Sequence, residues 1–243
     1  MPLSLLGGLT VATPAGAPVA LPTRKTALVL AALALAGDKG ASREQLAEWI
    51  WPDRSEGQAK SSLRQALTAL RKALPACLDG ATLESGADGL RLAAPAELID
   101  LHAFEQLAPS GAADGRRRAA ALYAGDLLEG VALSGPLDDL VTAHGERLRR
   151  QALALVEAMS EEDAGDREAR AACEALANRL LAADPAAEPA HRALIRLRLA
   201  EGQPNAARRQ LERCVEAVRR ELNVWPEERT RALLEAKPRK AAP

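Results

Sequence analysis

The segment EGQAKSSLRQALTALRKALP, residues 56–75, decides the fold of the first part of this chain. Leucines at positions 63, 67, 70 and 74 recur at helical spacing, so they form one apolar stripe that must face a core. The segment therefore predicts an amphipathic helix with a basic outer side. That side carries Ser61, Arg64, Gln65, Thr68 and Lys72, with Lys60 and Arg71 on its flanks and Glu56 as the only acid.

The residues before and after this helix predict its neighbours. Ser42 and Gln45 have the spacing of a capping box, which indicates a helix that ends before Pro52. Another helix is expected from Arg24, capped by Thr23 and ended by Gly37. Two β-type stretches, residues 3–13 and 17–22, flank a Thr-Pro-Ala-Gly turn and predict a small hairpin or meander. Residues 81–94 alternate around an Asp88-Gly89 turn, which is a hairpin signal.

From residue 97 onward the pattern is helical, with interruptions expected only at turns. Two similar helix-turn-helix segments follow one another, with Gly165 and Gly202 37 residues apart and Pro185 and Pro226 41 apart, near the tetratricopeptide period. The expected turns are Pro109-Ser110-Gly111, Ser134-Gly135-Pro136, Ala164-Gly165-Asp166, Asp184-Pro185 and Glu201-Gly202-Gln203-Pro204.

The predicted fold class is mainly α, with an N-terminal winged helix-turn-helix (α+β) followed by an all-α, tetratricopeptide-like helical array. The expected domains are residues 1–95, residues 96–236 and a flexible tail at 237–243.

Composition limits the choice of partners and compartment. The 243 residues have a formal net charge of −1, but residues 54–75 contain five Lys or Arg and one acid, so any argument for an anionic partner belongs to that segment. Cys77, Cys173 and Cys214 are far apart, which favours neither a disulfide framework nor a zinc site and fits a reduced cytoplasm. The chain opens without a basic signal region and its longest apolar run, residues 27–36, is shorter than the ~20 residues of a membrane span, so no export and no membrane insertion are expected.

The outer face of the 56–75 helix is rich in the groups that read DNA, although a basic helix face is also a common solvated surface. The predicted base-contacting residues are Lys60, Ser61, Arg64, Gln65 and Thr68. The predicted phosphate-contacting residues are Thr23, Arg24, Arg43, Arg71, Lys72 and Arg91. For Arg91, on the second strand of the hairpin, an exposed residue that keeps a sheet edge soluble is an equal alternative.

Residues 5–35 and 42–74 together resemble the N-terminal domain of the SARP family of bacterial transcriptional activators, which has an OmpR-type winged helix. ALYAGDLLEGVAL, AHRALIRLRLAEGQPNAARRQLERC and ELNVWPEERTRALLEA resemble that family's bacterial transcriptional activator domain. The resemblance covers residues 3–236 and implies an activator that binds double-stranded promoter DNA as two subunits in tandem on direct repeats. It also implies contact with the sigma or alpha subunit of RNA polymerase. Where the family usually has Gly this chain has Asn223, which also tolerates the left-handed backbone of that turn.

No enzyme, cofactor or metal site is expected. The sequence has no phosphate-binding loop, dinucleotide fingerprint, zinc-protease motif or nucleophile elbow. The three histidines, His102, His144 and His191, lie in separate predicted helices. The acidic pairs 138–139 and 161–162 lie near helix ends, where solvation or the helix dipole explains them. Trp49 and Trp51 are interpreted as core residues.

The alternative to a DNA-binding activator is an interaction adaptor whose helical array binds a protein or small effector. An anionic effector would require four arginines to gather on one side of that array. Ordinary solvated helix faces are the favoured explanation of these residues, which are Arg192, Arg196, Arg208 and Arg209.

Overall fold

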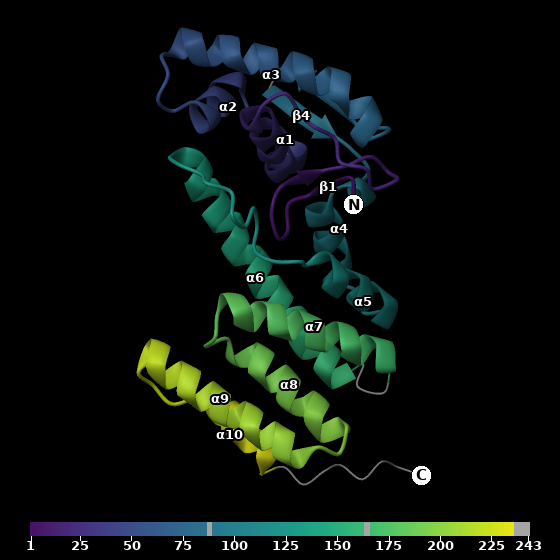
Figure 1. Cartoon of the computed structure of the whole chain (residues 1–243), viewed down its shortest axis with the longest axis vertical. Helices are drawn as coiled ribbons and strands as arrows, with labels where there is room; N and C mark the ends of the chain where they lie inside the picture. Colours follow the sequence, from purple (N-terminus) through teal and green to yellow (C-terminus); the bar gives the residue numbers. More distant parts are fainter. Residues whose placement is uncertain (87–88, 163–165, 236–243) are drawn as a thin grey trace. The chain divides into compact units, whose positions relative to one another are not determined.

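The computed structural model describes residues 1–86, 89–162 and 166–235 (Figure 1). The chain divides into two compact units: unit 1 is residues 1–103 with 126–147, and unit 2 is residues 104–125 with 148–243. Each unit is defined by the contacts among its residues and consists of two separate stretches of the chain. The domain boundary expected after residue 95 therefore stays a prediction. The expected tail at 237–243 lies outside the described residues. No helix in the described ranges is long and apolar enough to cross a membrane.

The N-terminal strands of unit 1 are shorter than expected. Strands β1 (Leu3–Ser4) and β2 (Thr10–Val11) pair antiparallel, and both lie within the first predicted β-type stretch. The second stretch contributes only a bridge between Ala12 and Pro18 after the predicted turn. Backbone amides of Leu5 and Leu6 donate to the carboxylate of Asp100, with N···O distances of 2.8 to 3.0 Å, which fastens this segment to the start of α4.

Helices α1 (Arg24–Ala36), α2 (Arg43–Ile50) and α3 (Glu56–Cys77) follow the sequence signals closely. The Thr23 side chain caps α1, Gly37 ends it, and a full capping box joins Ser42 and Gln45. Helix α3 continues two residues beyond its expected end, with Pro75 inside its last turn. Pro75 costs the helix one backbone hydrogen bond, because proline has no N–H group. The helix nevertheless continues past it, and the Leu78 amide still donates to the Leu74 carbonyl.

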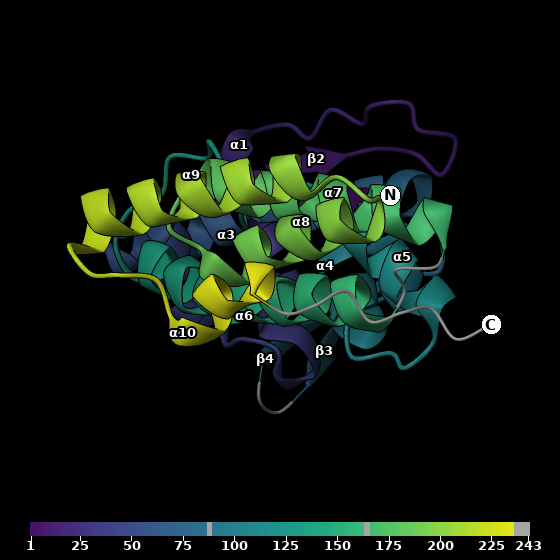
Figure 2. The ribbon, with the colours of Figure 1, turned by 90° about the horizontal axis from the view of Figure 1, so that it is seen from below.

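The wing follows α3. Strands β3 (Thr82–Gly86) and β4 (Gly89–Ala93) pair antiparallel and lie side by side in Figure 2; residues 87 and 88 of the predicted turn are outside the described residues. Ala41 and Leu90 exchange two backbone hydrogen bonds, which tie β4 to the start of α2. Gly89 has φ +133° and a Cβ there would lie 2.3 Å from the Ala41 carbonyl oxygen, so only glycine fits this contact.

The second half is helical, with one exception that the sequence did not predict. Residues 123–135 form no helix; Leu127 instead bridges to Leu6 and Gly8, and the Leu128 amide donates to the Leu5 carbonyl. The buried leucines of this segment complete the core of unit 1, so tertiary packing overrides their helix propensity.

The remaining helices build the array. They are α4 (Asp100–Leu107), α5 (Ala113–Leu122), α6 (Pro136–Glu162), α7 (Arg167–Ala183), α8 (Glu188–Ala200), α9 (Pro204–Leu222) and α10 (Glu228–Arg231), with short 3₁₀ turns at Gly37–Lys39, Ala96–Leu98 and Ala232–Leu234. Within unit 2, α5 packs on α7, α7 on α8 and α8 on α9 (Figures 1 and 2). Asn223 ends α9 in the left-handed conformation, with φ 55° and ψ 31°, as expected. This succession of packed antiparallel helices confirms the predicted fold class.

Candidate nucleic-acid interface

Helix α3 presents its predicted stripe to the core of unit 1. Leu63, Leu67, Leu70 and Leu74 are each at most 3% exposed, because α1 and α2 pack on that side. The opposite side is open to solvent and carries six of the predicted contact residues. These exposed residues are Ser61, Arg64, Gln65, Thr68, Arg71 and Lys72.

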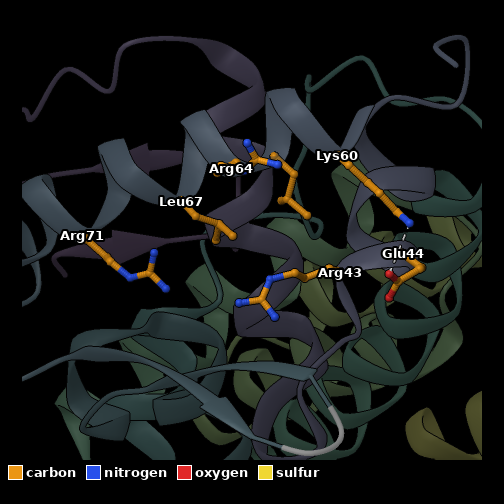
Figure 3. A pocket seen from close by; sticks show the side chains of 7 residues that line it. Arg43, Glu44, Lys60, Arg64, Leu67 and Arg71 are labelled. Atoms are coloured by element: carbon orange, nitrogen blue, oxygen red, sulfur yellow. Dashed lines mark ion pairs between the residues drawn. The ribbon is translucent and has the colours of Figure 1, made fainter. Parts of the chain in front are cut away.

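A hollow of about 220 Å³ lies between α2 and α3. Its apolar lining is formed by Leu63 and Leu67, and the other lining residues are four cations and one acid. These charged residues are Arg43, Glu44, Lys60, Arg64 and Arg71. In Figure 3 the Arg43 guanidinium lies below Leu67, with Arg64 above Leu67 and Arg71 to the left, so residues from two helices line the same hollow. Four predicted contact residues are therefore brought together.

A second hollow lies along the other flank of α3. It is lined by Ala20, Pro22, Arg64, Gln65, Thr68, Ala69, Lys72 and Ala73. Arg64 borders both hollows, so it stands on the ridge of the helix between them. The Thr68 hydroxyl donates to the Arg64 carbonyl at 2.9 Å, which leaves its oxygen free to accept from a ligand.

Cations around the first hollow differ in their partners. Among the described residues, no ion pair to Arg43, Arg64 or Arg71 is found. Lys60, in contrast, lies 2.7 Å from the Glu56 carboxylate and 3.6 Å from that of Glu44. The hydrogen bond to Glu56, together with the charges of both acids, raises the pKa of Lys60.

The wing arginine is also paired. Arg91 Nη2 lies 2.6 Å from Glu84 on β3 and Nη1 lies 3.1 Å from Asp38. The hydrogen bond to Glu84 is the first cause that raises the pKa of Arg91. Arg91 lies on the second wing strand as predicted, and its contact with phosphate stays a prediction.

Thr23 and Arg24 line neither hollow. The Thr23 hydroxyl accepts from the Thr26 amide at 3.1 Å, so it serves as the cap of α1. Arg24 Nη2 donates to the Ala132 carbonyl at 3.3 Å. Both residues are exposed, and their predicted phosphate contacts remain untested.

The sequence analysis named Glu56 but not its pairing with Lys60, and it missed the contributions of Glu44 and Asp38. The i,i+4 spacing of Glu56 and Lys60 was a readable signal for one pair. Glu44 and Asp38 could not be found in this way, because they approach their cations from other elements.

The four arginines that an anionic effector would require on one side of the helical array do not gather there. Arg192 is 0% exposed, and its Nε donates to Glu157 at 2.6 Å while its Nη1 donates to Thr230 at 3.0 Å. Arg196 pairs with Glu161 at 2.7 Å, and only Arg208 and Arg209 are exposed, on α9. Both earlier interpretations of Arg192 are wrong, because acids from α6 and from the α9–α10 connection enclose it.

The three histidines lie on α4, α6 and α8 and have different surroundings. His191 is buried between the Pro185 carbonyl and Gln210, His102 Nε2 lies 2.8 Å from the Ala34 carbonyl, and His144 lies beside Arg147. Trp51 is buried as expected, whereas Trp49 is half-buried. No group of three His, Cys, Asp or Glu side chains that could hold a metal ion is present in the described part of the chain.

The arrangement of three helices and a paired hairpin, followed by stacked helices, defines a winged helix-turn-helix joined to a helical array. The model of the bacterial transcriptional activator domain family matches residues 99–236, and the chain belongs to that family. This match confirms the sequence resemblance to the SARP family of bacterial transcriptional activators. A comparison with curated proteins gave no match.

One solved structure with a similar fold is that of Mycobacterium tuberculosis EmbR in complex with a low affinity phosphopeptide. The likeness has a TM-score of 0.70 at 23% sequence identity and covers 96% of this chain. The chain spans 63% of the length of that structure. The likeness supports the fold, and the phosphopeptide is a property of that complex.

Proposed function

We propose that this regulator binds promoter DNA through the outer face of α3 and activates transcription by contacting RNA polymerase. The observation that carries the proposal is the convergence of Arg43, Arg64 and Arg71, without acidic partners among the described residues, on one hollow beside the third helix of a winged helix-turn-helix. Residues 1–95 would form the DNA-binding part and residues 96–236 the activator part.

The position of each side chain supports a role on the duplex. Arg64, on the ridge of α3, suits bidentate pairing with a guanine edge, and Gln65 suits an adenine edge. Lys60, Ser61 and Thr68 would complete the base contacts. The expected phosphate contacts come from Thr23, Arg24, Arg43, Arg71, Lys72 and Arg91.

Arg43 is suited to phosphate for a second reason. It lies in the first turn of α2, where the helix dipole also favours an anion. Its contribution should therefore be independent of base sequence, unlike that of Arg64.

The test is binding of fluorescent promoter fragments, beginning with the region upstream of the protein's own coding sequence, across a salt series. Arg64→Ala should cost about 1–3 kcal/mol of specific affinity and relax discrimination between sequences. Arg43→Ala should weaken binding to all sequences alike and reduce the salt slope by about 0.9. Arg208→Ala, which removes an exposed arginine from α9, is the matched control and should bind like the wild type.

If Arg64→Ala and Arg43→Ala both bind like the wild type, the assignment of α3 is wrong. A protein that binds no duplex at low salt would instead favour the adaptor, in which the winged domain is only a protein-binding surface.

Contact with polymerase would use an exposed apolar corner at the end of α9. Leu222, Val224 and Trp225 are 60%, 52% and 62% exposed, and the Arg219 guanidinium lies 4.6 Å from the centre of a Trp225 ring. Tryptophan and arginine are the residue types that most often dominate protein interfaces. We therefore assign the contact with the sigma or alpha subunit to this corner.

Transcription in vitro with RNA polymerase holoenzyme, on a fragment that the protein binds, tests this assignment. Trp225→Ala should keep wild-type affinity for the fragment and lose most of the activation, whereas Arg64→Ala should lose both. Full activation by Trp225→Ala would remove the corner from the proposal. The ratio of chains to fragment at saturation would show whether two subunits bind in tandem.

A further inference from the structure

One cation on the proposed DNA-binding face is held by two acids from two helices. Lys60 Nζ lies 2.7 Å from Glu56, one turn earlier on α3, and 3.6 Å from Glu44 in the first turn of α2. The two carboxylates are 79% and 68% exposed, so both are open to an approaching duplex. This end of α3 therefore combines one positive with two negative charges.

The rest of the same hollow has the opposite character. Arg43, Arg64 and Arg71 border it without an acidic partner in the described ranges. Figure 3 shows Glu44 and Lys60 together at one end and Arg71 at the other. A DNA backbone following the hollow would pass from a cationic surface to a net anionic one.

Stabilisation of α3 accounts for only one of the two ion pairs of Lys60. A Glu four residues before a Lys supports its own helix, which explains Glu56. Glu44 lies in the first turn of α2, where it stabilises that helix, and its pairing with Lys60 adds nothing to the formation of α3. Its carboxylate nonetheless reaches Lys60, and its pKa is lowered, first by a backbone hydrogen bond and further by the charge of Lys60.

We propose that Glu44 and Glu56 are specificity-determining residues, which compete with DNA for Lys60 and so lower the affinity for unrelated sequences. Lys60 contacts DNA only when the duplex offers a better partner than these carboxylates, as a favourable base edge does. On other sequences the two acids keep Lys60 and repel the backbone. The inference rests on the proposed function of α3.

The experiment uses the full chain carrying Glu44→Gln and Glu56→Gln together, with a promoter fragment and an unrelated duplex of equal length. Freed Lys60 should add one phosphate contact, so the salt slope on the unrelated duplex should steepen by about 0.9. Its affinity at low salt should rise by roughly three- to tenfold. The ratio of specific to unrelated affinity should fall.

Two comparisons make the result specific to Lys60. Adding Lys60→Met to the double variant should remove the increase in slope. Glu48→Gln removes a carboxylate from the same helix α2 that has no ion pair with Lys60, and it should change the slope by much less. Circular dichroism checks that every variant keeps its helices.

An unchanged slope in the double variant would overturn the inference, and so would an equal increase with Lys60→Met present. In those cases loss of specific binding in Arg64→Ala would still support the proposed function. Absence of all DNA binding by the wild-type chain would instead reject the proposed function and this inference with it.

Discussion

Arg64 on α3 and Arg192 on α8 both belong to amphipathic helices, yet their surroundings are opposite. Arg64 is exposed, borders two hollows and has no ion pair within the described residues. Arg192 is fully buried and lies within 4 Å of Glu157, Glu188 and Glu227. The position and number of acids, more than the arginines themselves, distinguish a surface that can bind an anion from one that holds a fold together.

The network around Arg192 joins three parts of unit 2. Glu157 comes from α6, Arg192 from α8, and Thr230 from α10. The Thr230 hydroxyl donates to Glu188 at 2.6 Å and accepts from Arg192. Burial alone would raise the pKa of Glu157, but the hydrogen bond from Arg192 and the charges of three arginines outweigh it and lower that pKa. The short α10 segment is thereby fixed to the array.

The largest expected effect is that of Arg192→Met. This change keeps much of the side-chain volume but leaves acids around a buried site without their cation, so it should destabilise unit 2 by about 3 kcal/mol. Arg64→Met is the matched control and should change stability by less than about 0.5 kcal/mol, because that side chain faces water. Urea unfolding followed by circular dichroism gives both values.

Hydrogen exchange would locate the change caused by Arg192→Met. Peptides from α8 and α10 should lose protection, whereas those from α3 should not. If the two variants have equal unfolding free energies, the Arg192 network contributes no more to stability than an exposed side chain does. The contrast drawn between the two arginines would then be wrong.

The sequence was informative where local signals decide the structure. Thr23, the Ser42–Gln45 box and the leucines of residues 56–75 placed three helices and the outer face of α3, because caps and a 3.6-residue period act within one helix. Asn223 likewise ended α9 as expected.

Long-range contacts explain what could not be predicted. Residues 123–135 resemble a helix locally, but bridges from Leu127 to the N-terminal segment keep them out of a helix. Arg192 looked like a surface residue because Glu157 and Glu227 are each 35 residues away in the sequence. Glu44 reaches Lys60 from another helix for the same reason. The position of a residue in the helical repeat shows which face of its own helix it occupies. It does not show which charged residues of other elements lie against that face.

The smallest expected effect concerns His191, a buried polar group of unit 2. Its Nε2 lies 2.9 Å from the Pro185 carbonyl and its Nδ1 lies 2.7 Å from Gln210 Nε2. This geometry suits a neutral imidazole that donates from Nε2 and accepts at Nδ1. Burial is the main cause that lowers the pKa of His191 from its ordinary 6.5.

The sign of the pH effect follows from that direction. Because the folded protein binds this proton less readily than the unfolded chain, the contribution of His191 is complete above pH 6.5 and is lost as the pH falls below it. The unfolding free energy of the wild type should therefore fall more between pH 7 and pH 5 than that of His191→Gln, which has no proton to gain. Parallel pH profiles of the two proteins would contradict this prediction, and would mean that the Gln210 amide turns so that its oxygen accepts from a protonated His191 ring.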